Sequence, residues 1–470
     1  MGMGLHAPHD PWLASLEGVD AGVGVEQVAR GHQSPGIARQ PTVVDREIQR
    51  EWPDTRHAVD GATANDSRPP AHRYDSRMQR DLPIAVVGAG LGGLVTALAL
   101  AREGFRQIDV YERSPALGEV GAGLTISPNS SRALIALGLG PGLAERGDEP
   151  PGGMTRHWKT GRVLMRSVRG QALRERYGAP YLFIHRADLL DLLVEACAAQ
   201  PAVRIHTDHA LLDLSQDDRG VTLQFDGGRA ARAALAIGCD GVKSMVRERL
   251  LATDQPQFSG YVAWRALLPV DSVADLLDPP AQLFLGVDHL FMRYHVRHRT
   301  LTNVVAIARS TSGWTDEGWT LRSTVAELAS HYADWHPDIV RAISRVPPEQ
   351  CFKWAIHVRP PLATWRAGRV TVAGDAAHPM TPFMGMGAAM AIEDGVVLAR
   401  ACALRPTFEA AFEAYESVRR PRADFVQSES AKRGLRLVGS DPDSYGKTEE
   451  VSEDTLGLFA YDAMRVVEAA

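Results

Sequence analysis

Between residues 84 and 198, short apolar runs alternate with segments whose apolar residues follow a helical spacing. Residues 84–87 form an apolar run that predicts a buried strand, and residues 94–100 continue with a helical pattern. Residues 108–111 predict a second strand, and residues 184–198 carry apolar side chains three and four positions apart, as an amphipathic helix does. Strands that alternate with helices are typical of an α/β fold built on a parallel sheet.

A strand-rich block interrupts this alternation. Apolar runs separated by loops predict strands at residues 260–269, 281–285, 290–296 and 301–308. Antiparallel sheet is the natural interpretation of such a block. The earlier pattern returns at residues 368–396, and helices follow, the clearest at residues 407–417.

The predicted fold is therefore an α/β core that is split by an inserted α+β domain and followed by C-terminal helices. The expected boundaries are residues 82–155, 181–256 and 356–400 for the core, 156–180 and 257–355 for the mainly antiparallel inserted domain, and 401–470 for the C-terminal helical region. The cleft between core and insert is the default place for a ligand.

The first eighty residues differ from the rest. Residues 1–80 are rich in His, Pro, Arg, Asp and Gly and show no sustained helical or alternating pattern, so we expect a disordered or weakly attached extension. The segment lacks a basic start followed by an apolar core and is not a secretory signal. Met78 lies just before the first strand, which suggests the hypothesis that residues 1–77 are not translated. An intact mass that includes these residues would remove that hypothesis.

Composition narrows the function classes. The chain has 470 residues, a hydrophobic share of 45%, a charged share of 23% and a net charge of −6. Basic residues are neither in excess nor clustered, so no nucleic-acid partner is predicted. No apolar run is long enough to span a bilayer, so no membrane role is predicted. The four cysteines are far apart and lack metal-ligand spacing, which favours a reducing cytoplasm and no metal site.

A glycine-rich turn joins the strand at residues 84–87 to the helix that follows. Its spacing, Gly88-x-Gly90-x-x-Gly93, is the dinucleotide-binding pattern in its usual context between strand and helix. Gly88 permits the tight turn, Gly90 lets the backbone approach a pyrophosphate, and Gly93 lets helix and sheet pack closely. Glu112 lies about twenty residues farther on, where a carboxylate accepts hydrogen bonds from a ribose. An acid there disfavours a 2′-phosphate, so the turn predicts bound FAD or NAD rather than NADP.

A second loop, Gly374-Asp375-Ala376-Ala377-His378-Pro379, follows the apolar run 369–373 and leads into the apolar segment 388–392. This order predicts a strand end, a glycine-punctuated loop and the N-terminus of a helix. Free N–H groups at a helix N-terminus can hold a phosphate or an electron-rich ring edge. Asp375 suits a ribose or ribityl hydroxyl better than a phosphate, because two anions repel each other.

Three motifs in this order resemble those of the class A flavin-dependent aromatic monooxygenases. They are Gly88-x-Gly90-x-x-Gly93, Cys239-Asp240-Gly241 and Gly374-Asp375-Ala-Ala-His-Pro379, and the resemblance covers residues 82 to about 461. The sequences of residues 260–265, 378–384 and 388–394 look closest to those of 6-hydroxynicotinate 3-monooxygenase and salicylate-hydroxylase-like enzymes. The resemblance implies a Rossmann-like FAD-binding domain of the para-hydroxybenzoate hydroxylase type, in which the inserted sheet forms the substrate domain.

The resemblance also implies roles for individual residues. Gly88, Gly90, Gly93 and Glu112 would hold the adenosine half of FAD, and Arg132 and Arg186 would lie along its pyrophosphate and ribityl side. Asp240 would bind both the flavin and the nicotinamide cofactor, and Asp375 would bind the ribityl or pyrophosphate-linked hydroxyls. Pro379 would line the flavin ring, and Gly385, Gly387 and Ala388 would face its pyrimidine edge. A helix N-terminus at that edge stabilises the negative charge of reduced flavin.

The implied reaction is a hydroxylation. NADH or NADPH reduces FAD, O2 adds to form the flavin C4a-hydroperoxide, and its distal oxygen attacks a small aromatic or N-heteroaromatic acid. The enzyme is expected to act as a monomer or homodimer. Two alternatives stay open: a flavin-binding protein whose redox state controls a partner, and a flavin epoxidase or tailoring oxygenase with a larger substrate.

The expected substrate site departs from the nearest family pattern. Where 6-hydroxynicotinate hydroxylases carry histidines, this chain has Trp264 and Phe383. On the strand 290–296, Tyr294 or His295 is a candidate to approach a substrate oxygen, and these two residues point to opposite faces. The remaining candidates are Tyr261 and Arg265 for a carboxylate, with Trp264, Arg265 and Phe383 as the expected lining of the substrate pocket.

Two further polar positions are interpreted as structural. His378 lies in a motif that places it beside the cofactor, so we expect it to support the loop rather than to act as a base. Glu393 and Asp394 lie within the helix after the loop and are interpreted as a polar face or a capping contact rather than a metal pair.

Overall fold

A computed structural model describes residues 78–118, 122–252, 254–276, 281–310, 314, 321–439, 441–447 and 452–468. The predicted N-terminal extension lies outside these residues, apart from its last three positions. Met78 is buried and its backbone nitrogen donates to the Arg405 carbonyl oxygen at 3.2 Å. Arg80 donates to the Ala403 carbonyl oxygen at 3.1 Å. Residues 78–80 are therefore attached to the core, contrary to the prediction for the extension.

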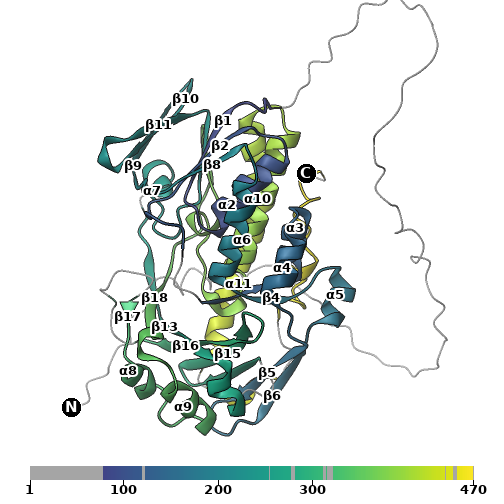
Figure 1. The fold of residues 1–470 in the computed structure, drawn as a ribbon, viewed down its shortest axis with the longest axis vertical. Coiled ribbons are helices and arrows are strands. Elements are labelled where there is room, and N and C mark those ends of the chain that lie inside the picture. Colours follow the sequence, from purple (N-terminus) through teal and green to yellow (C-terminus); the bar gives the residue numbers. More distant parts are fainter. Residues whose placement is uncertain are drawn as a thin grey trace, which may run out of the picture. The chain divides into compact units, whose positions relative to one another are not determined.

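Six strands form the sheet of the core, in the order β19-β20-β12-β1-β2-β8. In that order, their bounds are Arg366–Ala367, Val370–Val372, Leu235–Gly238, Pro83–Val87, Gln107–Tyr111 and Val203–His206. Strands β1, β2 and β8 lie side by side in Figure 1. All neighbours are parallel except β19, which is antiparallel to β20. The chain leaves β1 toward β2 and β8 and later returns to β12 on the other side. The carboxyl ends of β1 and β12 therefore form the switch point at which such sheets bind ligands.

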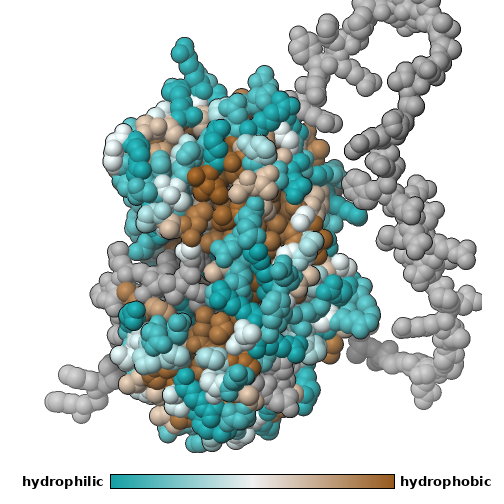
Figure 2. Space-filling view, viewed as in Figure 1, coloured by the Kyte–Doolittle hydropathy of each residue, from teal (hydrophilic) through white to brown (hydrophobic). Residues whose placement is uncertain are grey.

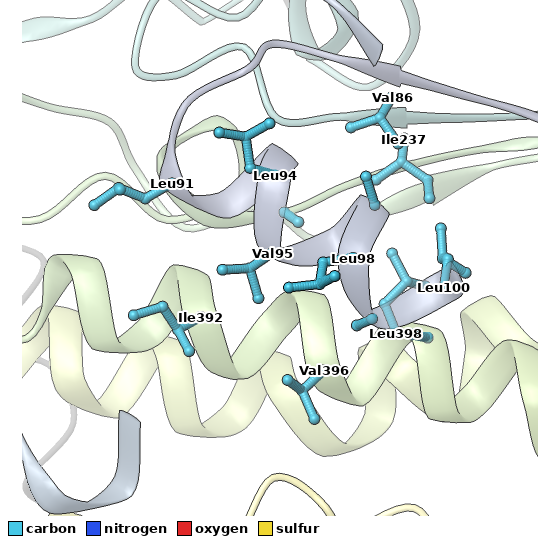
Figure 3. Packing of buried hydrophobic residues seen from close by; sticks show 14 of the residues in the cluster. Val86, Leu91, Leu94, Val95, Leu98, Leu100, Ile237, Ile392, Val396 and Leu398 are labelled. Atoms are coloured by element: carbon cyan, nitrogen blue, oxygen red, sulfur yellow. The ribbon is translucent and has the colours of Figure 1, made fainter. Parts of the chain in front are cut away.

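Helices α2 and α6 pack against this sheet and against each other, and α10 packs against α2; the bounds of α2, α6 and α10 are Leu91–Arg102, Arg186–Ala198 and Gly387–Leu404. Leu94, Val95 and Leu98 of α2 and Ile392 and Val396 of α10 belong to one hydrophobic cluster, and all five side chains are fully buried (Figure 3). Because α2 starts at the first strand and α10 starts at the later glycine-rich loop, this packing brings the two distant loops to one side of the core.

Eight strands form the sheet of the inserted domain, in the order β17-β18-β13-β16-β15-β14-β5-β6. In that order, their bounds are Leu321–Arg322, Phe352–Val358, Gln257–Pro269, Leu301–Arg309, His289–Val296, Gln282–Gly286, Gly152–His157 and Val163–Val168. Every neighbouring pair is antiparallel except β14 with β5, which is parallel. The predicted fold class, an α/β core with a mainly antiparallel insert, is confirmed. The insert's sheet begins at Gly152, four residues before the predicted boundary.

Smaller elements complete the two parts. A sheet in the order β11-β10-β9 comprises Ala230–Ala233, Gly220–Phe225 and Leu211–Asp217, and a sheet in the order β3-β7-β4 comprises Gly123–Ile126, Leu182–His185 and Gly147–Asp148. The short helices are α3 (Pro128–Ala136), α4 (Gly140–Arg146), α5 (Gln171–Tyr177), α7 (Met245–Leu250), α8 (Val325–Ser330) and α9 (Pro337–Ser344). The sheet β3-β7-β4 contacts β15 and thereby links core and insert.

Helix α11 spans Phe408–Leu437, twenty residues farther than the predicted end at residue 417. The helix continues through Pro421, and its buried residues Phe412, Tyr415 and Val426 pack against the core. Tertiary packing therefore outweighs the cost of an internal proline. Beyond Leu437 the described residues contain 3-10 turns and no α-helix, so α-helix occupies only the first part of the predicted C-terminal helical region.

None of the described helices is long and apolar enough to cross a membrane. On the face drawn in Figure 2, hydrophilic residues dominate and apolar residues reach the surface in patches between them.

Candidate active site

The turn after β1 has the geometry of a dinucleotide cradle. Gly88 has a φ of +101°, and a Cβ atom there would lie 2.4 Å from the Cys239 carbonyl oxygen. A Cβ atom at Gly93 would lie 1.9 Å from the Gly88 carbonyl oxygen, so helix and turn touch backbone to backbone. At Gly90, in contrast, a Cβ atom would meet nothing within 4 Å. The backbone at Gly90 is thus open to an approaching group at the N-terminus of α2, as a pyrophosphate requires.

Glu112 lies beside this turn at the end of β2. Its carboxylate oxygens accept hydrogen bonds from the backbone nitrogens of Ala89 at 2.8 Å and Ser114 at 2.9 Å. These bonds orient an acid at the carboxyl edge of the sheet, which is where a ribose diol binds in this type of turn. The position agrees with the predicted role of Glu112 in holding adenosine.

The second glycine-rich loop joins β20 to α10 next to the first. The Asp375 side chain is exposed to solvent, although many protein atoms lie around its carboxylate. Burial raises the pKa of Asp375, whereas nearby His378 and Arg186 lower it. A carboxylate in this position can accept hydrogen bonds from sugar hydroxyls, as predicted for the ribityl side of the cofactor. Pro379 is buried in the same loop.

The N-terminus of α10 follows that loop. Gly385 has a φ of +63° and turns the chain into the helix, which begins at Gly387 and continues with Ala388. The first N–H groups of an α-helix have no partner within the helix, so they are available to an electron-rich ring edge. This arrangement suits the predicted contacts of Gly385, Gly387 and Ala388 with the flavin.

Glu393 and Asp394 lie on the buried face of α10 rather than on a polar face. Asp394 accepts hydrogen bonds from the Gly374 backbone nitrogen at 2.8 Å and the His378 ring at 2.6 Å, and from the Arg419 guanidinium at 2.7 Å. Glu393 accepts from Arg419 and Arg422 of α11 and from Asn129. We call these six side chains the buried ion cluster: Asn129, His378, Glu393, Asp394, Arg419 and Arg422.

The buried ion cluster fixes the loop that carries Asp375. Burial alone would raise the pKa of Asp394, but His378 and Arg419 lower it from 3.8 to about 2, so the carboxylate is ionised at neutral pH. The interpretation of His378 as a structural residue agrees with these contacts. The interpretation of Glu393 and Asp394 as a polar face is wrong, because two acids within an apolar helix require buried cationic partners. The same requirement could have predicted from the sequence that cations such as Arg419 and Arg422 pair with these acids.

Two predicted cofactor residues have protein partners in the structure. The Arg132 guanidinium donates to the carbonyl oxygens of Tyr461 at 3.0 Å and Tyr177 at 2.6 Å, and so holds the C-terminal segment. The Asp240 carboxylate accepts from the Ser244 hydroxyl at 2.5 Å and the Val246 nitrogen at 3.1 Å, at the start of α7. These contacts give both residues a structural role, and their contact with a cofactor stays a prediction.

Arg186 is the third charged residue predicted on the cofactor side. It begins α6, and its backbone nitrogen donates to the Ala122 carbonyl oxygen at 2.8 Å. Burial lowers the pKa of Arg186, and the opposite charge of Asp375 raises it. The contact of Arg186 with the cofactor stays a prediction.

The two faces of the eight-stranded sheet have different neighbours. The inner face, which carries Tyr261, Arg265 and Tyr294, is the one that meets the loop after β20: the Tyr261 and Phe383 rings lie 5.0 Å apart at an angle of 77°. The outer face, which carries Trp264 and His295, is covered by α8, α9 and the 3-10 turn Val270–Leu276. Alternation along each strand enforces this division.

The structure corrects two predictions of substrate contact. Trp264 packs on the outer face, where its indole nitrogen donates to the Ser323 hydroxyl at 3.0 Å. His295 shares that face and lies 3.3 Å from the Thr302 hydroxyl. Both residues point away from Phe383, so neither lies where a substrate beside that loop would bind. The error arises because both faces of the strands are apolar, and the sequence does not show which one is inward.

Tyr294 and Tyr261 lie on the inner face but are protonated. Burial raises the pKa of each hydroxyl, most strongly for Tyr294. The Tyr294 ring stacks on Phe183 with centroids 4.2 Å apart. A protonated Tyr261 can donate a hydrogen bond to a substrate oxygen, whereas the Tyr294 hydroxyl packs against Gly123; neither is a base at neutral pH.

Arg265 is a buried cation on the inner face. Its side chain is 9% exposed and lies over the rings of Trp354 at 5.4 Å and Phe352 at 5.9 Å. Burial, together with the charge of Arg186, lowers the pKa of Arg265 to about 10, so the guanidinium keeps its charge at neutral pH. Arg265 and Arg186 together favour an anion between the inserted domain and the Asp375 loop.

Substitution of Gly90 separates cofactor binding from folding. Gly90→Ala places a methyl group where no protein atom lies within 4 Å, and its φ of −71° is accessible to alanine. We expect unfolding without added FAD to be unchanged within about 0.5 kcal/mol, and the FAD dissociation constant to rise about a hundredfold because the methyl group occupies the pyrophosphate position. Flavin fluorescence titration measures the effect. Gly118→Ala is the control, because a Cβ atom at Gly118 also meets nothing within 4 Å. Equal FAD affinity in both variants would contradict the placement of the pyrophosphate at Gly90.

Comparison with known proteins agrees with this geometry. A family model described as an FAD binding domain matches residues 81–430. The chain is 38% identical over 355 residues to 3-amino-4-hydroxybenzoate 2-monooxygenase of Streptomyces platensis, covering 75% of this chain and 87% of the relative. It is 36% identical over 372 residues to 6-hydroxynicotinate 3-monooxygenase of Pseudomonas fluorescens, covering 78% and 94%.

A solved structure extends the similarity to the fold. A salicylate hydroxylase substrate complex superimposes with a TM-score of 0.70 at 26% identity, covering 83% of this chain and 98% of that one. The predicted resemblance and the Rossmann-like FAD-binding fold with an inserted sheet are confirmed. Within the described residues no cluster of His, Cys, Asp and Glu is suited to a metal ion. The chain belongs to the family of FAD-binding aromatic monooxygenases.

Proposed function

We propose that this protein hydroxylates a small aromatic acid, with NADH or NADPH as the reductant and O2 as the oxidant. The balanced reaction is Ar–H + NAD(P)H + H⁺ + O2 → Ar–OH + NAD(P)⁺ + H2O. The observation that carries the proposal is Arg265, a buried cation on the face of the inserted sheet that meets the loop of Phe383, where the charge of Arg186 also acts on it.

A carboxylate is the natural partner for such a group. Arginine binds carboxylates in a bidentate manner, and burial strengthens the bond because little water competes. The relatives described above are named for the turnover of a hydroxybenzoate and a hydroxynicotinate, both of which carry a carboxylate. We therefore place the acid group of the substrate at Arg265 and its ring on the inner face, beside the contacting rings of Tyr261 and Phe383.

The residues for the cofactor fit FAD. Gly90 and the N-terminus of α2 would accept the pyrophosphate, Glu112 the adenosine ribose, Asp375 the ribityl chain, and the N-terminus of α10 the ring edge. When bound, FAD supplies the electron transfer from NAD(P)H and the activation of O2. The protein orients the ring, shields the reacting atoms from water and neutralises the acid.

Electron density for the attack has to come from the substrate itself, because Tyr261 and Tyr294 are protonated and His295 faces away. A hydroxyl or amino substituent on the ring supplies it. The cytoplasmic location and the monomeric or dimeric state stay predictions.

Consumption of NADH and NADPH by the purified flavoprotein tests the proposal. The acids are 3-amino-4-hydroxybenzoate, 3-hydroxybenzoate, 6-hydroxynicotinate and salicylate, each compared with the same ring without the carboxylate. We expect at least one acid to stimulate consumption about tenfold or more, and its decarboxylated counterpart to have little effect. If FAD is bound and no acid stimulates consumption, the proposed function is wrong.

A further inference from the structure

The segment after α11 reaches the inner face of the inserted sheet. Tyr445 in this segment packs against a cluster that includes Tyr261, Leu290 and Phe383. The same cluster contains Leu437 and Val438 from the end of α11. Tyr445, from the C-terminal region, therefore belongs to the same hydrophobic cluster of the inner face as Phe383, beside which we place the substrate ring.

Contacts on both sides hold Tyr445 in place. Asp443 pairs with Arg162 of the hairpin between β5 and β6, and lies 3.8 Å from the His157 ring. A Cβ atom at Gly446 would lie 2.7 Å from the Leu164 carbonyl oxygen, so the segment touches the backbone of β6. The position of the tyrosine is thus set by the inserted domain and does not depend on the tail alone.

The Tyr445 hydroxyl is buried, and in the part of the chain that the structure describes it has no hydrogen-bond partner. The hydrophobic cluster against which Tyr445 packs also includes Leu283, Leu285 and Val305. A buried hydroxyl without a partner destabilises the folded protein, because the group loses its bonds to water and gains none. Such a group in a native protein calls for an explanation, and a ligand that binds beside it is one.

Other buried tyrosine hydroxyls of the inserted domain show the contrast. Tyr332 on the outer face donates to the carbonyl oxygens of Leu290 at 2.9 Å and Ile307 at 3.2 Å. Its hydroxyl is satisfied by the same strands whose inner face meets Tyr445. The unpartnered hydroxyl is therefore on the side that faces Phe383.

We propose that Tyr445 determines substrate specificity: its hydroxyl forms a hydrogen bond with a hydroxyl or amino substituent of the aromatic ring. The inference rests on the proposed function, because that function places the substrate ring on the inner face beside Phe383. Tyr445 would recognise the substituent that activates the ring, while Arg265 binds the acid group at another point. Two separated polar contacts fix the orientation of a flat ring, and so select the carbon that is hydroxylated.

The test is a double-mutant cycle between protein and ligand. The purified holoenzyme and its Tyr445→Phe variant are titrated with benzoate, the three hydroxybenzoates and 3-amino-4-hydroxybenzoate, and binding is followed by the flavin absorbance. We expect the variant to bind benzoate as the wild type does, and to lose about tenfold in affinity for at least one substituted acid. We also expect its thermal midpoint without ligand to rise by about 1–3 °C, because an unpaired hydroxyl has been removed.

Tyr332→Phe is the matched control. It removes a buried hydroxyl with two partners, so it should lower the thermal midpoint and leave the ratio of affinities between substituted and unsubstituted acids unchanged. If Tyr445→Phe leaves that ratio unchanged for every acid, or lowers the thermal midpoint, the specificity role is wrong. If the wild type itself responds to no aromatic acid in binding or NAD(P)H consumption, the proposed function fails and this inference fails with it.

Discussion

Arg265→Gln should raise the KM for the aromatic acid about a hundredfold while leaving FAD binding unchanged. The guanidinium is 9% exposed and has Arg186 as a cationic neighbour, so a bound carboxylate exchanges its contacts with water for a charge-assisted bidentate bond. Loss of one partner from such a bond costs about 2–5 kcal/mol, and about 2.7 kcal/mol corresponds to a hundredfold change. Steady-state NAD(P)H oxidation with the acid that gives the greatest stimulation measures the effect.

Comparison with the neutral amide of the same acid isolates the charge contact. The amide should have nearly the same KM with the wild type and with Arg265→Gln, because it has no carboxylate for the guanidinium to bind. Arg293→Gln is the control, since Arg293 is a buried arginine on the outer face of the same sheet and should leave KM unchanged. A hundredfold loss in both variants, or in neither, would show that Arg265 does not bind the acid group.

Arg419→Met should lower the free energy of unfolding by about 3–5 kcal/mol, because it leaves Glu393 and Asp394 buried without their shared cation. Arg419 and both acids are fully buried, and their oxygens lie within 2.7 Å of its guanidinium nitrogens. Since Asp394 also holds the Gly374 nitrogen, the variant should also bind FAD less tightly. Urea unfolding of the holoprotein, together with the bound flavin per chain, measures both effects.

The pH dependence of this loss of unfolding free energy gives an independent check. The folded pKa of Asp394, about 2, is below its unfolded value of 3.8, so the ionised carboxylate contributes stability above pH 4. That contribution disappears as the pH falls from 4 toward 2, and the difference between wild type and Arg419→Met should narrow over the same range. Arg204→Met removes the exposed pair with Asp109 and should cost less than about 1 kcal/mol. Equal costs in the two variants would contradict the importance of the buried ion cluster.

The cofactor side of the site could be predicted because each part of it is local in sequence. The turn Gly88-x-Gly90-x-x-Gly93, the acid Glu112 and the loop of Asp375 each follow a strand end, and parallel strands bring their carboxyl ends to one edge. The family resemblance added the order of the motifs, and the matching family model and relatives confirm it.

The substrate side could not be predicted to the same degree. Trp264 and Arg265 are neighbours in sequence, yet they lie on opposite faces, and covering by α8 and α9 decides which face is inward. The cationic partners Arg419 and Arg422 of Glu393 and Asp394 come from the part of α11 beyond residue 417, where the helix was expected to end. Tyr445 belongs to a segment without periodicity, and only the fold brings it to the inner face.

The most direct test of the account is oxygen-18 labelling of the product. The flavoprotein is incubated with NAD(P)H and the stimulating acid under ¹⁸O2 in ordinary water, and the mass of the product is measured by mass spectrometry. We predict that one oxygen atom from ¹⁸O2 enters the aromatic ring for each NAD(P)H that is consumed productively. Consumption of NAD(P)H with hydrogen peroxide as the sole oxygen product, or a new hydroxyl that carries oxygen from water, would contradict the assignment of this protein as an aromatic hydroxylase.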